Sequence, residues 1–375
     1  MWVRALSLTD FRSYPQVDVE LAPGVTTFLG RNGQGKTNLI EALGFLSTLE
    51  SHRVAGDAPL VRHGAPLAVI RGRLAGEREV TLEVAITPGK ANRGRVNGAA
   101  VPRVREILGH LRTVLFAPED LALVKGDPSD RRRFLDDLLI QRTPRLAGVR
   151  ADFDRVLKQR NALLKSAGVA RRRAEDEMLR TLEVWDAQLI EHGAPIIAAR
   201  IGLLDELREP ARSQLAIIAG DDEARLDLQY VSSLGDSAPT TADVDAWTQA
   251  LADAITRRRS DELDRGLTLI GPQRDDVLIT LGDMPAKGYA SHGESWSIAL
   301  ALRLAAFDIL REDGIDPVLI LDDVFAELDH PRRERLAGQV QSATQVLITA
   351  AVDADVPSEL AGARFIVADG AVMPG

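Results

Sequence analysis

Alternating apolar and polar positions dominate residues 1–120. The stretches Val3–Leu8, Val17–Leu21, Val69–Leu74 and Val80–Ile86 alternate, and Val25–Leu29 is a short apolar run. A period of two is typical of half-buried strands. Asn97-Gly98 has the composition of a two-residue hairpin turn. We therefore expect this region to be built of strands.

The pattern changes twice along the rest of the chain. Between Asp130 and Asp264 apolar residues recur every three to four positions, apart from a polar, turn-rich break at Gly220–Thr241. Strand patterns return from Leu267, where Val318–Leu321 and Val346–Ile348 are typical of buried parallel strands. The pattern predicts an α/β head that is split in sequence, over residues 1–126 and 265–375. An all-helical arm, residues 127–264, is inserted between its halves.

Composition narrows the class of protein. The chain has 375 residues, of which 45% are hydrophobic and 27% charged, as expected of a globular protein with two or three packed units. It contains no cysteine, which excludes disulfides and thiolate metal sites. No apolar run approaches the roughly 20 residues that span a bilayer, and the N-terminus lacks the layout of a secretory signal. We expect a cytoplasmic protein without a membrane partner.

Charge is unevenly distributed. The net charge is −9, yet fourteen Lys and Arg against six Asp between Lys125 and Arg173 give this stretch +8, which leaves −17 for the remainder. A basic surface on an acidic protein can be the binding site of a polyanion such as DNA. A solvated helical face would show the same excess.

A phosphate-binding loop follows the Val25–Leu29 strand. Residues 30–37 fit G-x-x-x-x-G-K-[ST] in full, and an apolar helix pattern begins directly after them. The glycines let backbone N–H groups surround phosphates, and the helix N-terminus adds a positive dipole. We expect Lys36 to reach the β- and γ-phosphates of ATP and the Thr37 hydroxyl to ligate Mg²⁺. The nucleotide-binding residues predicted here are Gly30, Arg31, Asn32, Gly33, Gln34, Gly35, Lys36 and Thr37.

Two carboxylates end the apolar run Val318–Leu321. Asp322 and Asp323 have the layout of a Walker B strand end. A buried strand would bring Asp322 beside Thr37, where it would serve the Mg²⁺ shell. We assign Asp323, with Lys36, to catalysis, because its carboxylate would polarise the attacking water.

A second candidate anion site lies at Ser291-His292-Gly293-Glu294, before a long apolar helix pattern. Ser291 could simply cap its own helix. Alternatively, Ser291 and Gly293 could bind the γ-phosphate held by a second copy of the chain, so that two ATP molecules join a symmetric dimer. The Ser291–Glu294 motif lies about thirty residues before Asp322, which is the order of these motifs in ABC-type ATPases. Ala326–Asp329 matches their D-loop.

Several further segments resemble the RecF family of bacterial recombination-repair ATPases, across about residues 3–370. They are Phe11–Tyr14, Val96–Gly98, Leu108–Asp136, Gly271–Asp276, with Gln273 in place of the usual His, Lys287–Ser291 and Asp322–Asp329. The resemblance implies an ATP-dependent homodimer that binds DNA and hydrolyses ATP slowly, as a switch. It further implies that RecO and RecR are partners in loading RecA at gaps and in the SOS response. It places Arg12 near the nucleotide, and we assign Arg131, Arg132 and Arg133 to DNA.

Some positions depart from the ABC pattern. No switch histidine follows Val346–Ile348, Asp323 is one methylene shorter than the usual Glu, and Pro118–Asp120 stands where transporters carry a glutamine. Each departure weakens the apparatus for ATP hydrolysis, which suits an ATPase that acts as a switch better than one that acts as a motor. The competing classes are an ABC transporter subunit, an SMC-type chromosome-organising ATPase, whose arm needs far more heptads, and a DNA scaffold with a vestigial nucleotide site. The presence of Lys36 and Asp322 argues against a scaffold with a vestigial nucleotide site.

Overall fold

The structure is a computed structural model that describes residues 1–169, 175–221 and 225–375. The chain divides into two compact units. Unit 1 comprises Met1–Lys125, Glu209–Leu226 and Ala286–Gly375, and unit 2 comprises Gly126–Arg208 and Asp227–Pro285. The N- and C-terminal parts of the chain therefore share one unit, as the sequence predicts for a split head.

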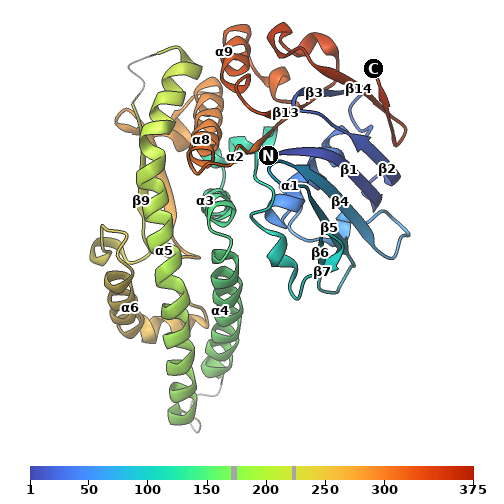
Figure 1. The fold of residues 1–375 in the computed structure, drawn as a ribbon. Coiled ribbons are helices and arrows are strands. Elements are labelled where there is room, and N and C mark those ends of the chain that lie inside the picture. The colour runs from blue at the N-terminus through green and yellow to red at the C-terminus, as the bar shows by residue number, and fades with distance from the viewer. Residues whose placement is uncertain (170–174, 222–224) are drawn as a thin grey trace. The chain divides into compact units, whose positions relative to one another are not determined.

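An antiparallel sheet forms one half of unit 1. Its strand order is β2-β1-β4-β5-β6-β7, and Figure 1 shows β7 at one free edge. The alternating burial of these strands follows the alternating sequence, since successive side chains leave a strand on opposite faces. The bounds are β1 Trp2–Phe11, β2 Tyr14–Glu20, β4 Ala68–Ala75, β5 Val80–Ile86, β6 Arg93–Val96 and β7 Ala99–Ala100.

A second sheet of unit 1 carries the predicted buried strands. Its order is β15-β14-β3-β13-β12-β8, and all pairs are parallel except β14 with β15. Parallel strands need crossover connections, which is why neighbours in this sheet lie far apart in sequence. The bounds are β3 Gly24–Leu29, β8 Thr113–Phe116, β12 Val318–Asp322, β13 Gln345–Ala350, β14 Ala363–Ala368 and β15 Ala371–Pro374.

Helix α1 (Lys36–Thr48) packs against both sheets and joins their cores. Gly72 of β4 permits this close approach, because a Cβ there would lie 2.9 Å from Leu46 of the helix. The buried side chain of Gln345 also links the sheets, since it exchanges hydrogen bonds of 2.8 and 2.9 Å with the Val3 backbone. The remaining helices of unit 1 are α2 Leu121–Lys125, α7 Ala286–Tyr289, α8 His292–Glu312 and α9 His330–Val340.

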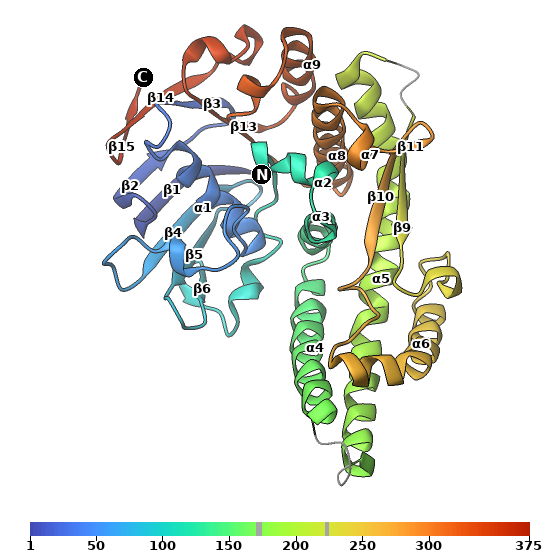
Figure 2. The ribbon, with the colours of Figure 1, turned by 180° about the vertical axis from the view of Figure 1, so that it is seen from behind.

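Unit 2 is mainly helical. Its apolar core brings together Phe153 and Val156 of α4, Ile197 of α5 and Trp247 and Leu251 of α6. A three-stranded sheet of order β11-β10-β9 accompanies the helices, as Figure 2 shows. The bounds are α3 Pro128–Arg142, α4 Leu146–Val169, α5 Glu175–Ala219, which continues into unit 1, β9 Leu226–Val231, α6 Val244–Arg265, β10 Asp276–Leu281 and β11 Met284–Pro285.

Buried ion pairs replace apolar packing in parts of unit 2. Arg160 is fully buried and bonds Asp186 at 2.8 Å and Glu262 at 2.5 Å. Arg200 binds both carboxylate oxygens of Asp136, at 2.7 and 2.8 Å. Burying an arginine is tolerable only with such a complete set of acceptors.

Unit 2 differs in two respects from the predicted all-helical arm. Strand β9 lies within the polar break that the sequence reads as a turn-rich interruption. Residues up to Pro285 group with this unit, whereas the sequence places the return to the head at residue 265. Both differences have one cause, because β10 and β11 form a sheet with β9.

Candidate functional site

The phosphate-binding loop lies in unit 1 between β3 and α1. Gly33 and Gly35 have φ of 83° and 108°, the left-handed region where a side chain would be strained. A Cβ on Gly35 would also lie 2.7 Å from the Tyr14 hydroxyl, which donates to the Gly35 carbonyl. Gly30 passes so close to β14 that a Cβ would lie 2.3 Å from the Val367 carbonyl oxygen. These glycines are required by the shape of the loop.

Side chains of the loop hold it in place. The buried Lys36 ammonium donates to the Gly30 carbonyl at 2.8 Å and contacts the Asn32 amide oxygen at 3.4 Å. The Gln34 amide oxygen accepts from the Asp369 N–H at 2.7 Å. Arg31 is exposed at the tip of the loop.

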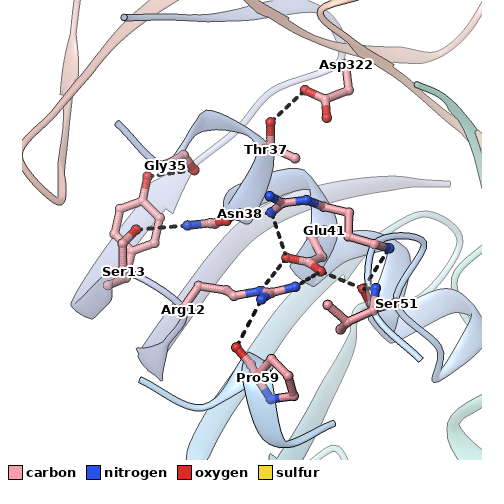
Figure 3. A network of polar contacts seen from close by, with 12 residues as sticks. Arg12, Ser13, Gly35, Thr37, Asn38, Glu41, Ser51, Pro59 and Asp322 are labelled. Atoms are coloured by element: carbon pink, nitrogen blue, oxygen red, sulfur yellow. Dashed lines mark hydrogen bonds and ion pairs between the residues drawn. The ribbon is translucent and has the colours of Figure 1, made fainter. Parts of the chain in front are cut away.

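The end of β12 meets the start of α1. Thr37 donates its hydroxyl to Asp322 at 3.1 Å, and Thr349, at the end of β13, donates to the same oxygen at 2.5 Å. Figure 3 shows the first of these bonds. Burial raises the pKa of Asp322 from 3.8 to about 6, and the nearby carboxylates of Asp323 and Glu119 add to the rise. A hydroxyl and a carboxylate converging in this way fit Mg²⁺, which prefers hard oxygen ligands.

Asp323 leaves the strand in a different direction. Its φ of 51° lies in the left-handed region, and its N–H donates to the Thr349 hydroxyl at 3.0 Å. Its side chain is 32% exposed and lies 4.0 Å from the Lys36 ammonium. Burial raises the pKa of Asp323, while Lys36 opposes the rise. The two adjacent carboxylates thus have distinct surroundings, with Asp322 buried and Asp323 beside the loop.

Arg12 is tied to the helix that the loop opens. It also has a left-handed φ, 52°. Its guanidinium binds both oxygens of the buried Glu41, at 2.8 and 2.5 Å, and donates to the Pro59 carbonyl at 3.1 Å. Glu41 further accepts from Ser51 at 2.5 Å and from Arg53 at 3.4 Å. Figure 3 shows these contacts converging on Glu41.

A pocket of about 630 Å³ lies beside this network. Arg12, Ser13, Asn38, Arg62 and His63 are among its lining residues. Asn38 directly follows Thr37, and its amide donates to Ser13 at 2.9 Å. The pocket therefore opens next to the phosphate loop.

Ser291 is the N-cap of α8. Its hydroxyl accepts from the Glu294 N–H at 3.2 Å, and the Glu294 carboxylate accepts from the Ser291 N–H at 2.7 Å. This capping box is the structural role that the sequence analysis considered for Ser291. The N-terminus of α8 lies at the surface. Among the described residues, no hydrogen bond or ion pair joins Ser291 to the phosphate loop.

The D-loop contacts the same helix. Asp329 caps α9 and binds Arg332 at 2.6 Å, and Arg332 donates to Ser297 of α8 at 3.0 Å. The Arg332 guanidinium also covers Gly293, where a Cβ would lie 3.3 Å from it. Gly293 and the D-loop are thereby held together.

The three arginines assigned to DNA lie in different surroundings. Arg131 is 6% exposed and binds both oxygens of Asp276, at 2.7 and 2.9 Å. Arg132 donates to the Asp275 carbonyl at 2.7 Å, and Arg133 is partly exposed. The charge of Arg131 is therefore compensated by Asp276 within unit 2. The last arginines of the basic stretch, Arg171–Arg173, lie outside the described residues.

Sequence reasoning missed several site residues. Thr349, Glu41, Ser51 and Arg53 carry no local motif, and only the fold brings them to the loop. Within the described ranges, no cluster of three or more His, Cys, Asp or Glu could hold a metal ion. No helix in these ranges has the length and apolar character to cross a membrane.

Comparison with known proteins identifies the family. The family model "RecF/RecN/SMC N terminal domain" matches residues 2–359. The DNA replication and repair protein RecF of Frankia alni is 56% identical over 376 residues, covering 100% of this chain and 99% of its own length. That of Streptomyces avermitilis is also 56% identical, covering 99% of both chains.

Solved structures agree with this result. A structure of the recombination mediator protein RecF with ATPrS, in the RecFOR pathway, has a TM-score of 0.88 at 29% identity, covering 100% of this chain and 98% of that one. The Smc head domain of Pyrococcus furiosus has a TM-score of 0.55 at 17% identity, covering 100% of this chain and 96% of that chain, and shares the fold. The chain belongs to the RecF family of DNA replication and repair proteins, with an ABC/SMC-like ATPase head.

Proposed function

We propose that this chain is an ATP-controlled DNA clamp of recombinational repair and replication restart. ATP joins two copies into a dimer that holds DNA at gaps or junctions, and slow, DNA-stimulated hydrolysis releases it. Together with RecO and RecR, the clamp promotes RecA loading and the SOS response in the cytoplasm. The family and the ATP-bound structures of relatives support this proposal.

The observation that carries the proposal is the meeting of the phosphate loop with β12. The loop backbone and Lys36 bind the β- and γ-phosphates, while Thr37 and Asp322 hold the metal. The chemistry supplied by a bound Mg²⁺ is charge neutralisation on these phosphates. The pocket lined by Arg12 and Asn38 takes the remainder of the nucleotide.

Asp323 orients the attacking water. Its carboxylate is 32% exposed and lies 4.0 Å from Lys36, which supports a role beside the γ-phosphate. Its raised pKa lets it accept a proton more readily than an ordinary aspartate. It lacks a histidine partner, since Thr349 occupies the end of β13 and bonds Asp322.

The second half of the ATP site comes from another copy. Ser291 and Gly293 stand at the exposed start of α8, and the Arg332 guanidinium, which pairs with Asp329, lies against Gly293. A helix N-terminus of this kind binds anions. Two such contacts, related by a twofold axis, would join the dimer through two ATP molecules.

The test compares Asp322→Asn with Asp323→Asn by measuring the residence time of the protein on gapped DNA with ATP and Mg²⁺. Asp322→Asn should weaken metal-dependent ATP binding and shorten the residence time. Asp323→Asn should keep ATP, lose about 10²-fold or more in turnover and stay on DNA longer than the wild type. The proposal is wrong if both variants leave DNA alike, or if Asp323→Asn dissociates as fast as the wild type.

A further inference from the structure

Five cations gather in one segment of unit 1. Residues 88–105 contain five basic residues and no acidic one, in a chain whose net charge is −9. We call them the edge cations: Lys90, Arg93, Arg95, Arg103 and Arg105. The segment forms β6, β7 and the flanking turns at the free edge of the antiparallel sheet (Figure 1).

Strand β6 fixes the direction of two of these side chains. Arg93 and Arg95 are exposed while Gly94 between them is buried, so both guanidinium groups leave the same face of the strand, about 7 Å apart along it. A Cβ on Gly94 would lie 3.0 Å from Val101 and 3.1 Å from Ile107. The other face of β6 thus packs against the short helix η2 (Val104–Ile107), which holds the strand in place.

The remaining edge cations surround the end of the sheet. Lys90 lies in the exposed turn before β6, and Arg103 and Arg105 flank Val104, which packs near Gly94. Between them, residues 98–100 are small and exposed. The small residues therefore leave the side chains of the edge cations uncovered on this turn.

Three carboxylates lie near the edge cations: Glu83, Glu106, which follows Arg105, and Asp57, which accepts from Asn92 at 2.6 Å. Arg95 lies 3.8 Å from Glu83, but Glu83 binds Arg71 more closely, at 2.5 and 2.9 Å. Within the part of the chain that the structure describes, no ion pair involves the other four edge cations. Arg131 and Arg160 of unit 2 are paired and buried instead. Lys90, Arg93 and Arg103 are exposed and Arg105 is half-buried. Exposed cations without a carboxylate partner on an acidic protein mark a surface that attracts polyanions.

We propose that the edge cations form a docking surface for the phosphate backbone of duplex DNA. The inference rests on the proposed DNA-binding function and gives it a location. Residues 88–105 contain no aromatic side chain, so they lack the aromatic platforms on which the bases of a single strand stack. Cations that contact only phosphates bind DNA without reading its sequence.

Charged residues also protect sheet edges from pairing with other chains. The two roles respond differently to substitution. Edge protection concerns self-association, whereas phosphate contact concerns DNA affinity and its dependence on salt.

The experiment measures duplex DNA binding by fluorescence anisotropy, with ATP, over a range of salt concentrations. In the variant Lys90→Gln/Arg93→Gln/Arg95→Gln, each lost phosphate contact should reduce the log–log salt slope by roughly 0.9. The dissociation constant should rise about tenfold or more, and ATP-dependent dimerisation should stay unchanged. The matched control Arg180→Gln/Arg257→Gln/Arg258→Gln removes the same charge from exposed helix positions of unit 2 and should leave the slope unchanged. Arg93→Lys/Arg95→Lys should retain binding, since phosphate contact needs the charge.

The outcomes separate this inference from the proposed function. If the wild type binds duplex DNA and the triple Gln variant binds with the same affinity and slope, the docking surface is wrong. Self-association of that variant with unaltered DNA affinity would assign the cations to edge protection. Tighter binding of single strands through these residues would overturn the choice of duplex. If the wild type does not bind DNA with ATP at all, the proposed function fails as well.

Discussion

Replacing Asp322 by asparagine should make the nucleotide-free protein more stable although it damages the site. Burial raises the pKa of this carboxyl from 3.8 to about 6, so at neutral pH the folded chain holds an anion in a place that disfavours it. Asparagine has nearly the same shape, and its oxygen can still accept from Thr37 and Thr349. The variant removes the cost of the buried charge and keeps these contacts.

The size of the effect follows from linkage between protonation and folding. Unfolding lowers the pKa of Asp322, so between pH 4 and 7 the folded chain binds more protons than the unfolded one, and stability falls as the pH rises. A change from 3.8 to about 6 costs about 3 kcal/mol at pH 7. At pH 4 the same linkage gives about 0.5 kcal/mol. We therefore expect the variant to gain unfolding free energy mainly at pH 7 and to gain little at pH 4.

Thermal unfolding of the metal-free, nucleotide-free protein measures this gain. At pH 7 the Asp322→Asn variant should melt roughly 4–6 °C above the wild type, from the usual entropy of unfolding per residue. The difference should nearly vanish at pH 4. Asp323→Asn is the matched control, and its gain should be smaller because its side chain is 32% exposed. An Asp322→Asn variant that is no more stable at pH 7, or equally stabilised at both pH values, would refute the reasoning.

Two further predictions follow from the ion pairs and the helix cap. Arg131→Gln leaves the partly exposed Asp276 without its bidentate partner and should destabilise unit 2 by about 1–3 kcal/mol, measured by denaturant unfolding, while the salt slope of DNA binding stays unchanged. A reduced slope at full stability would return Arg131 to the DNA surface. Ser291→Arg places a bulky cation at the start of α8 and should abolish the ATP-dependent dimer seen by light scattering while ATP affinity changes only a few-fold, whereas normal dimerisation would contradict the two-copy site.

The sequence by itself determined the elements whose chemistry is local. The phosphate loop is contiguous, so its glycine positions and Lys36 are visible as a motif, and the backbone angles of Gly33 and Gly35 agree with it. The run ending at Asp322 was equally readable, because a strand buried on both faces must be apolar throughout. The strands of the antiparallel sheet followed from alternation.

Only the tertiary structure decided which charges are paired. Arg131 and Asp276 are 145 positions apart, so the local excess of positive charge gave no sign that the arginine is neutralised. The reverse holds for residues 88–105, where a shorter run of cations stays exposed because β7 ends the sheet. Strand β9 and the extent of unit 2 were likewise hidden, since they depend on pairing with β10.

The same limit applies to the site. Thr349 reaches Asp322 because β12 and β13 are neighbours in register, and Glu41 reaches Arg12 because α1 packs on β1. A sequence motif shows only the residues that one contiguous segment contributes to a site. The partners that hold a motif's side chains come from other segments, and strand order and helix packing alone bring them within hydrogen-bond distance.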